Sequence, residues 1–131
     1  MKTKNVIAFD RFKRSGASKY NASTQVVDGI AFHSRKEAGY YQQLKLEVRT
    51  KLIKDFKRQV AFDLFAFCPL DHTFVNGTPV RVCRHDVDFL VTLPDGSQEV
   101  REVKGFATAE WDLKRKIFEA NYPNIPYKVI R

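Results

Sequence analysis

The chain has 131 residues, about the length of one domain, and 44% of them are hydrophobic, which is enough to bury a core without disulfides or a structural metal. Its two cysteines fit neither a disulfide framework nor a zinc motif, and no apolar run approaches the roughly 20 residues that cross a bilayer, so we expect a soluble cytoplasmic protein without a membrane span. The formal net charge of +8 favours a polyanionic partner such as nucleic acid, although a merely solubilising basic surface explains it equally well.

Much of the excess charge lies at the start of the chain. Residues 1–25 hold six basic residues and one acidic residue, together with short runs of Ser, Gly, Ala, Asn and Thr that are typical of flexible segments. We therefore predict a flexible basic N-terminal arm at residues 1–24, followed by a folded domain at residues 25–131. Such an arm suits sequence-independent attraction to a phosphate backbone.

The first predicted elements are a short hairpin and a helix. Residues 26–32 have the pattern of two short strands around Asp28-Gly29. The next element is a helix that opens at Ser34 and runs to about Phe56. Its apolar residues keep helical spacing along one stripe, at Tyr41, Leu44, Val48 and Leu52.

The rest of the chain predicts three strands, a second helix and a last strand. The strands are expected at residues 59–67, 80–93 and 98–106, with a loop near 68–79 and a turn at 94–96. The helix begins near Thr108 and ends before Pro123, and the strand at 127–130 joins the sheet by a crossover. The order is α-β-β-β-α-β, which predicts an α/β fold with a mixed β-sheet flanked by helices.

The turn at residues 94–96 fixes the register of its hairpin. Pro-Asp-Gly favours a three-residue loop with Pro at the first corner and Gly in the left-handed conformation, so that Leu93 faces Ser97. A two-residue loop would slip the register by one. Counting back from Leu93, the favoured register places two charged pairs on one face of the sheet: Asp88 with Glu102, and Asp86 with Lys104.

These four side chains have two interpretations. They form either a structural ladder of solvent-facing ion pairs or a site where opposed carboxylates need a cation between them. Glu37 bears on this choice, because it continues the apolar stripe of the first helix and a carboxylate there needs a partner, a metal or backbone hydrogen bonds. Ser34-x-x-Glu37 is also a capping box, in which Glu37 would fold back onto the start of its own helix.

Asp88, Glu102-Val103-Lys104, Glu37 and the predicted order of elements resemble the PD-(D/E)xK nuclease superfamily. More narrowly, four segments are similar to a family of small phage proteins in that superfamily, related to phage endonuclease I and the archaeal junction resolvases, that resolve four-way (Holliday) DNA junctions. The segments are Val27-Asp28-Gly29-Ile30, Phe32-x-Ser34-x-x-Glu37-Ala38, Asp88-Phe89 and Val103-Lys104-Gly105-Phe106.

The resemblance covers residues 25–131 and departs from the superfamily pattern at one place. The usual Pro-Asp is absent, and the chain has Val87-Asp88 with Asp86 close by. Phe89 favours Asp88 as the metal ligand, but the choice between Asp86 and Asp88 stays open from the sequence.

The resemblance implies a restriction-endonuclease-like core, a homodimer and a Mg²⁺-dependent endodeoxyribonuclease that acts on branched DNA and accepts Mn²⁺ in place of Mg²⁺. Asp88, Glu102 and the Val103 carbonyl would hold the metal, Lys104 would orient the attacking water, and Glu37 would hold a second ion or its water shell. If the gene is carried by a phage, the protein works in the cytoplasm of the bacterial host.

Five basic residues are candidates for a DNA path, although a solvated helix face explains them equally well: Arg35, Lys36, Lys114, Arg115 and Lys116. Two further functions remain open at this stage. One is a less selective nuclease that cuts forks, flaps or duplex, and the other is a nucleic-acid-binding module whose acidic cluster is only structural.

Overall fold

The computed structural model describes residues 24–66 and 80–131. The predicted basic arm and the predicted loop near 68–79 lie outside the described residues. The chain falls into two compact units, residues 1–42 and 43–131, which divide within a helix.

The first unit contains the predicted hairpin. Strands β1 (Gln25–Val27) and β2 (Ile30–Phe32) pair antiparallel around a two-residue turn. Asp28 and Gly29 both have positive φ, 53° and 76°, which is the conformation that a tight hairpin turn requires and that Asp-Gly adopts readily. The hydroxyl of Tyr41 donates to the Asp28 carboxylate at 3.2 Å, so the helix that follows holds this turn in place.

Helix α2 (Arg35–Arg49) begins where the sequence predicts and ends seven residues early. Its end is set at Thr50, whose hydroxyl donates to the Leu46 carbonyl, and at Lys51, which has a φ of 63°. A left-handed residue directly after a helix stops it. The prediction that the helix runs to about Phe56 is therefore wrong, and Leu52, predicted on its apolar stripe, lies outside the helix and is 67% exposed.

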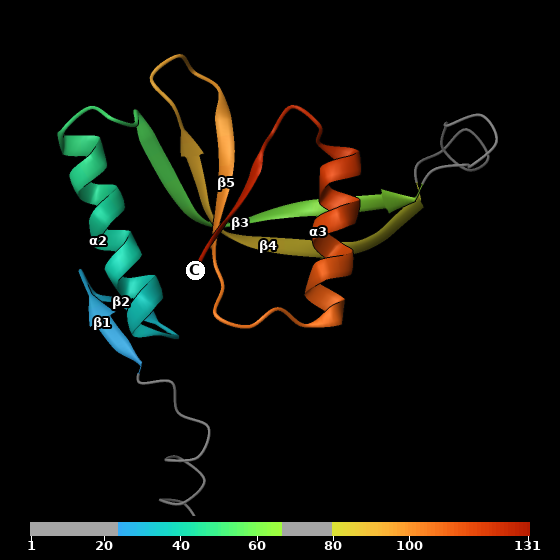
Figure 1. Cartoon of the computed structure of the whole chain (residues 1–131), viewed down its shortest axis with the longest axis horizontal. Helices are drawn as coiled ribbons and strands as arrows, with labels where there is room; N and C mark the ends of the chain where they lie inside the picture. Colours follow the sequence, from blue (N-terminus) through green and yellow to red (C-terminus); the bar gives the residue numbers. More distant parts are fainter. Residues whose placement is uncertain (1–23, 67–79) are drawn as a thin grey trace, which may run out of the picture. The chain divides into compact units, whose positions relative to one another are not determined.

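The second unit is built on a mixed four-stranded sheet in the order β3-β4-β5-β6. Strands β3 (Asp55–Ala66), β4 (Val80–Thr92) and β5 (Gln98–Val103) pair antiparallel, and β6 (Tyr127–Ile130) joins β5 in parallel. In Figure 1, β3 and β4 continue past the other strands as a long two-stranded ribbon. The predicted α/β class, mixed sheet and α-β-β-β-α-β order are confirmed.

The turn between β4 and β5 has the predicted geometry. Leu93 N–H donates to the Ser97 carbonyl and Gly96 N–H to the Leu93 carbonyl, at 2.8 and 2.9 Å, and Gly96 has a φ of 88°. The pairs that follow run from Thr92 with Gln98 to Phe89 with Arg101. This register puts Asp88 and Glu102 at the next opposed position, as the sequence predicts.

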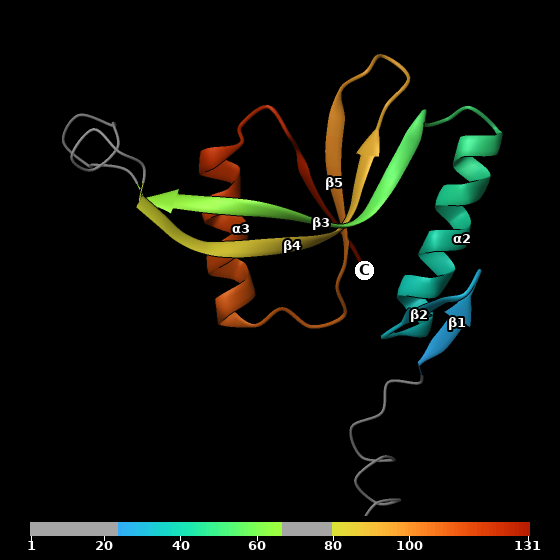
Figure 2. The ribbon, with the colours of Figure 1, turned by 180° about the vertical axis from the view of Figure 1, so that it is seen from behind.

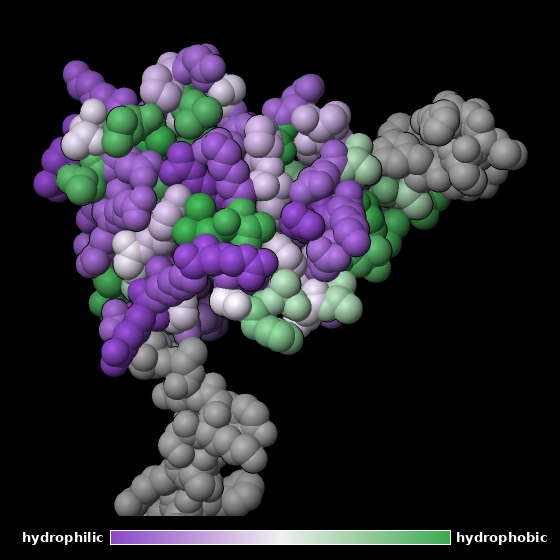
Figure 3. Space-filling view, in the orientation of Figure 1, coloured by the Kyte–Doolittle hydropathy of each residue, from purple (hydrophilic) through white to green (hydrophobic). Residues whose placement is uncertain are grey.

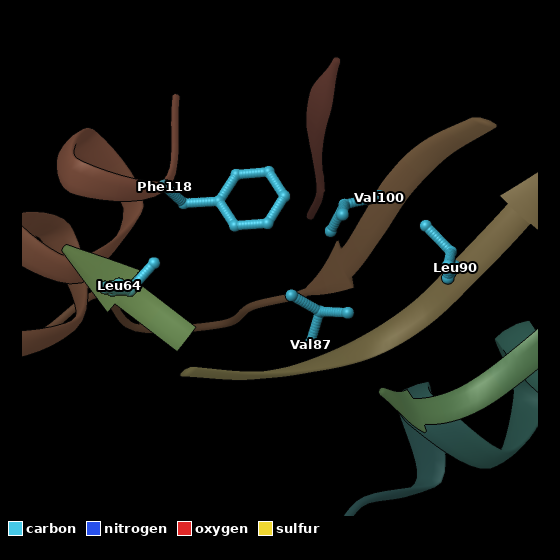
Figure 4. Close-up of a cluster of buried hydrophobic side chains, with 5 residues drawn as sticks. All are labelled: Leu64, Val87, Leu90, Val100 and Phe118. Carbon is cyan, nitrogen blue, oxygen red and sulfur yellow. The ribbon is translucent and has the colours of Figure 1, made fainter. Parts of the chain in front are cut away.

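Helix α3 (Ala109–Asn121) makes the crossover from β5 to β6 and lies against one face of the β3–β4 ribbon, as Figures 1 and 2 show from opposite sides. Thr108 caps it by accepting the N–H of Trp111 at 3.1 Å. Phe118 from this helix closes a core whose other buried members come from the sheet (Figure 4): Leu64, Val87, Leu90 and Val100.

An ion network lies next to this core on β5. Glu99, 2% exposed, bonds Arg101 and Lys128, each at 2.8 Å. Arg101 also bonds Glu47, in the last turns of α2, at 2.8 Å. The described part of the chain includes no helix with both the length and the apolar character needed to span a membrane.

Candidate functional site

Strands β4 and β5 separate at the predicted acidic cluster. Their regular pairing ends at Phe89 and Arg101, one residue before Asp88 and Glu102. On the other side of β4, strand β3 is kinked at Gln59, whose φ of 51° falls between its regular pairs with β4. A residue in the left-handed region distorts a strand locally. Asp88 is therefore flanked by an irregular position on β3 and by the opening between β4 and β5.

The two acids bind backbone groups across this opening. Asp88 N–H donates to Oε2 of Glu102 at 2.9 Å, and Val103 N–H donates to Oδ2 of Asp88 at 2.9 Å. Each carboxylate thus binds an N–H from the strand that carries the other carboxylate. These reciprocal bonds hold the Asp88 and Glu102 side chains beside each other at a defined place in the sheet.

The environment of the pair disfavours two negative charges. Burial and the nearby Asp88 carboxylate raise the pKa of Glu102 to about 7, against the lowering effect of the Asp88 N–H and of Lys104. Burial also raises the pKa of Asp88, although the Val103 N–H and Lys104 lower it. Glu102 is only 5% exposed and makes no ion pair with the described residues. When both buried carboxylates are ionised, the pair has an excess of negative charge that a cation would neutralise.

Lys104 lies two residues after Glu102, directly after the end of β5. Its N–H extends the parallel pairing by donating to the Ile130 carbonyl at 3.0 Å, which fixes its backbone beside β6. Its ammonium lies 5.2 Å from the centre of the Trp111 ring, a cation–π distance. Because its charge lowers the pKa of both Asp88 and Glu102, Lys104 acts electrostatically on both acids.

A cleft of about 290 Å³ opens beside Glu102 and Lys104. It is bounded by the end of β5, the start of α3 and the inner part of β4, and its lining is mostly polar. The other lining residues are Arg84, His85, Asp86, Thr108, Glu110, Trp111 and Lys114.

His85, which lines the cleft, contacts Tyr127 on β6. His85 Nε2 lies 2.9 Å from the Tyr127 hydroxyl, and the two rings stack with centroids 5.9 Å apart. Burial, followed by the Lys114 charge, lowers the pKa of His85. Burial, followed by the negative charge of Glu102, raises the pKa of Tyr127.

Asp86 takes a position other than the one expected, whereas the expected role of the Val103 carbonyl as a metal ligand stays a prediction. Asp86 does not pair with Lys104, because β4 and β5 have already separated, and it bonds Arg84 at 2.8 Å instead. It lines the cleft, but it is Asp88 that shares hydrogen bonds with the strand of Glu102. Val103 donates its N–H to Asp88, and because the N–H and carbonyl of one strand residue point to the same edge, its carbonyl faces β4 as well.

Glu37 and its two basic neighbours belong to the first unit. Glu37 is 8% exposed, and its N–H donates to the Ser34 hydroxyl at 3.1 Å, which is one half of the capping box. Arg35 and Lys36 are exposed in the first turn of α2. The role of Glu37 beside a metal therefore stays a prediction.

The basic residues of α3 are engaged along their own helix. Lys114 pairs with Glu110 at 3.2 Å, and Lys116 with Asp112 at 3.0 Å. Arg115 pairs with Asp112 and lies over the Trp111 ring, with 5.6 Å from its guanidinium carbon to the ring centre. Figure 3 shows a hydrophilic surface over much of α3, as these charged pairs require. Lys114 is the member of this group that also lines the cleft.

The donor set fits a hard divalent cation. No group of three or more His, Cys, Asp and Glu side chains able to hold a metal gathers within residues 24–66 and 80–131. Mg²⁺ does not require such a cage, because it keeps several waters and is commonly held by one or two carboxylates plus phosphate oxygens of a substrate. Two neighbouring carboxylates that repel each other match that demand.

Sequence reasoning missed the aromatic side of the site. The sequence predictions place Trp111 within the second helix and give it no role in the site, yet it lies against Lys104 and lines the cleft. The available signal was the short link from Lys104 to the cap at Thr108, which brings the first turn of α3 back to the end of β5. No local sequence pattern predicts the position of Tyr127, because that position depends on the parallel pairing of β6 with β5.

Comparison with known proteins identifies a family but no activity. No curated protein and no solved structure matches the chain. A family model described as a protein of unknown function (DUF1064) matches residues 17–131, which include both acids, Lys104 and all the described elements. The chain is therefore a member of the DUF1064 family.

Proposed function

We propose that the protein is a metal-dependent endodeoxyribonuclease that hydrolyses phosphodiester bonds in branched DNA, above all in four-way junctions. The observation that carries the proposal is the buried Asp88–Glu102 pair, which holds two repelling carboxylates together beside Lys104. Ion pairing does not stabilise this arrangement, because both carboxyl groups lose solvation and neither makes a salt bridge with a residue that the structure describes.

The chemistry follows from the position of these three side chains. Asp88 and Glu102 would hold Mg²⁺, or Mn²⁺ in its place, through the carboxylate oxygens that are not bound to backbone N–H groups. The bound ion would lower the pKa of a water and offset charge on the phosphate. Lys104 would donate to that water or to a phosphate oxygen, and so stabilise the negative charge that develops during attack.

The substrate and the assembly come from the resemblance and the charge. The net charge of +8 suits a polyanionic substrate, and the similarity to phage junction resolvases favours branched DNA and a homodimer with a restriction-endonuclease-like core. A dimer would present two such centres, one for each of the two strands that junction resolution must cut.

A panel of labelled DNA substrates tests the proposal. Purified protein with Mg²⁺ is offered a synthetic four-way junction, a fork, a flap and linear duplexes of the same sequence. Paired nicks placed symmetrically in the junction, with the duplexes intact, are the expected result. Cutting of all substrates at similar rates would establish the less selective nuclease instead.

The non-catalytic alternative is separated by two variants. Glu102→Ala and Lys104→Ala should each abolish cleavage while leaving junction binding, measured by gel shift with Ca²⁺, within about threefold of wild type. If wild-type protein cuts no DNA with Mg²⁺ or Mn²⁺ and both variants bind DNA as it does, the protein is a binding module.

A further inference from the structure

Trp111 is buried outside the main hydrophobic cluster of its unit. It lies in the first turn of α3, is 8% exposed and lines the cleft beside Glu102 and Lys104. Its backbone is fixed by the N-cap, where Thr108 accepts its N–H. The buried core cluster of this unit is formed by other residues, with Phe118 as the contribution of α3.

The ring and the indole nitrogen of Trp111 face two different partners. The ring lies under the Lys104 ammonium at 5.2 Å and meets the edge of Tyr127, with centroids 6.1 Å apart. The indole Nε1 is buried and has no hydrogen bond of full length and angle to the described residues. Trp111 and Glu102 line the same cleft, which places this carboxylate within the surroundings of the indole N–H.

We infer that Trp111 is a positioning residue of the proposed metal centre: its ring supports the Lys104 ammonium, and its indole N–H donates to the Glu102 carboxylate when a cation is bound. This inference rests on the proposed function. In this role, Trp111 holds the Glu102 carboxylate and the Lys104 ammonium at a fixed separation.

Two physical arguments support this role. A buried N–H without a good acceptor costs free energy, and the ionised carboxylate of Glu102, which lines the same cleft, is a strong acceptor. Lys104 has no ion pair with the described residues, so the aromatic face is the contact that restrains its ammonium beside the acids. Groups that orient metal ligands typically change metal affinity by about 10–100-fold when they are removed.

The experiment is calorimetric titration of metal-free protein with Mn²⁺, for wild type and three variants. Trp111→Phe keeps a ring under Lys104 but removes the N–H, and Trp111→Leu removes both. Tyr122→Phe is the matched control, because it deletes one hydrogen-bonding group from the end of the same helix, where the Tyr122 hydroxyl donates to the Asp63 carbonyl.

The expected result is Mn²⁺ affinity that falls about tenfold or more in Trp111→Phe and stays within twofold of wild type in Tyr122→Phe. In single-turnover cleavage at saturating Mn²⁺, Trp111→Leu should be slower than Trp111→Phe, because only the latter still supports Lys104. Thermal melting identifies any variant that is unfolded.

Trp111 also supplies a direct signal, because it is the only tryptophan in the chain. Mn²⁺ should quench its fluorescence in wild type with saturation, Mg²⁺ should reverse the quenching, and Glu102→Gln should remove it. Saturable Mn²⁺ binding with the same affinity in wild type and Trp111→Phe would overturn the inference and leave the proposed function standing. Absence of Mn²⁺ binding by wild type would overturn both.

Discussion

Two buried glutamates three residues apart on β5 have opposite surroundings. Glu99 is bonded by Lys128 and Arg101, and these hydrogen bonds outweigh its burial and keep its pKa below the ordinary value. Glu102 is buried to a similar degree, but its neighbour is the Asp88 carboxylate and its pKa is raised to about 7. The same strand thus carries Glu99, whose charge is neutralised by two basic residues, and Glu102, whose neighbour is a second carboxylate.

The difference separates a structural acid from a candidate functional one. The Glu99 network joins β5 and β6 and reaches Glu47 in α2 through Arg101, so its charges stabilise the fold as it stands. The Glu102 site lacks such a cation at salt-bridge distance within the described residues, and it opens into the cleft. Buried groups with perturbed pKa values in a cleft are candidates for function.

The largest expected effect is on cleavage. Glu102→Gln should slow junction cleavage by about a thousandfold at saturating Mg²⁺, because an amide oxygen is a weaker ligand than a carboxylate and brings no charge to offset that of the cation. Glu99→Gln should stay within about tenfold of wild type at a temperature where it is folded. Single-turnover rates on the same junction measure both. Equal losses in the two variants would erase the functional distinction between the two glutamates.

The same two substitutions should change stability in opposite directions. Glu99→Gln should lower the free energy of unfolding by about 3 kcal/mol, because it weakens the bonds of residue 99 to the largely buried Arg101 and to Lys128. Glu102→Gln should raise it by about 2–3 kcal/mol at pH 8 in EDTA, since the amide oxygen still accepts the Asp88 N–H and the repulsion is gone. Urea unfolding measures both, and a loss of stability in Glu102→Gln would refute the electrostatic account of the pair.

The pH dependence of stability should follow Glu102. Its pKa is near 4.5 in the unfolded chain and about 7 in the folded protein, so between these values the folded state binds the extra proton. The contribution of Glu102 to the stability of metal-free protein should therefore fall as pH rises from about 4.5 to about 7, and then level off. Comparing wild type with Glu102→Gln across this range isolates the effect. A difference between them that does not vary with pH would show that the pKa is not raised.

The smallest expected effect concerns the helix surface. Lys116 forms an exposed pair with Asp112, which contributes at most about 1 kcal/mol to stability. Lys116→Gln should leave cleavage unchanged at low salt and should reduce the salt dependence of junction binding by about one ion only if this face contacts DNA. Filter binding at several salt concentrations distinguishes that outcome from a solvated helix face, for which the slope does not change.

Local chemistry made much of the site predictable. Pro94 and Gly96 dictate one turn type, and that turn sets the register that opposes Asp88 and Glu102. The same counting failed for Asp86 and Lys104, because it assumes a ladder that continues, whereas the strands separate after Phe89. Nothing in the sequence marks Gln59 as the residue that takes a positive φ on the neighbouring strand.

Other parts of the fold could not be predicted, because helix-ending residues or long-range packing override the local hydrophobic pattern. The helical spacing of Leu52 continues the stripe of α2, but the Thr50 hydroxyl and the left-handed Lys51 end the helix first, and Ile53 is buried in its place. Trp111 could be placed within the second predicted helix, but its contact with Lys104 depends on how α3 packs against the sheet. Long-range packing of this kind is not encoded in local patterns.

The most direct test of the central claim, that Asp88 and Glu102 together hold a divalent cation, is thermal melting with and without Mg²⁺ or Mn²⁺. A ligand that binds only the folded state raises its melting temperature. The melting temperature of wild type should rise with increasing metal concentration, while that of Glu102→Gln, already stable without metal, should not. A wild-type melting temperature that is unaffected by either metal, or a rise of the same size in the variant, would contradict the claim.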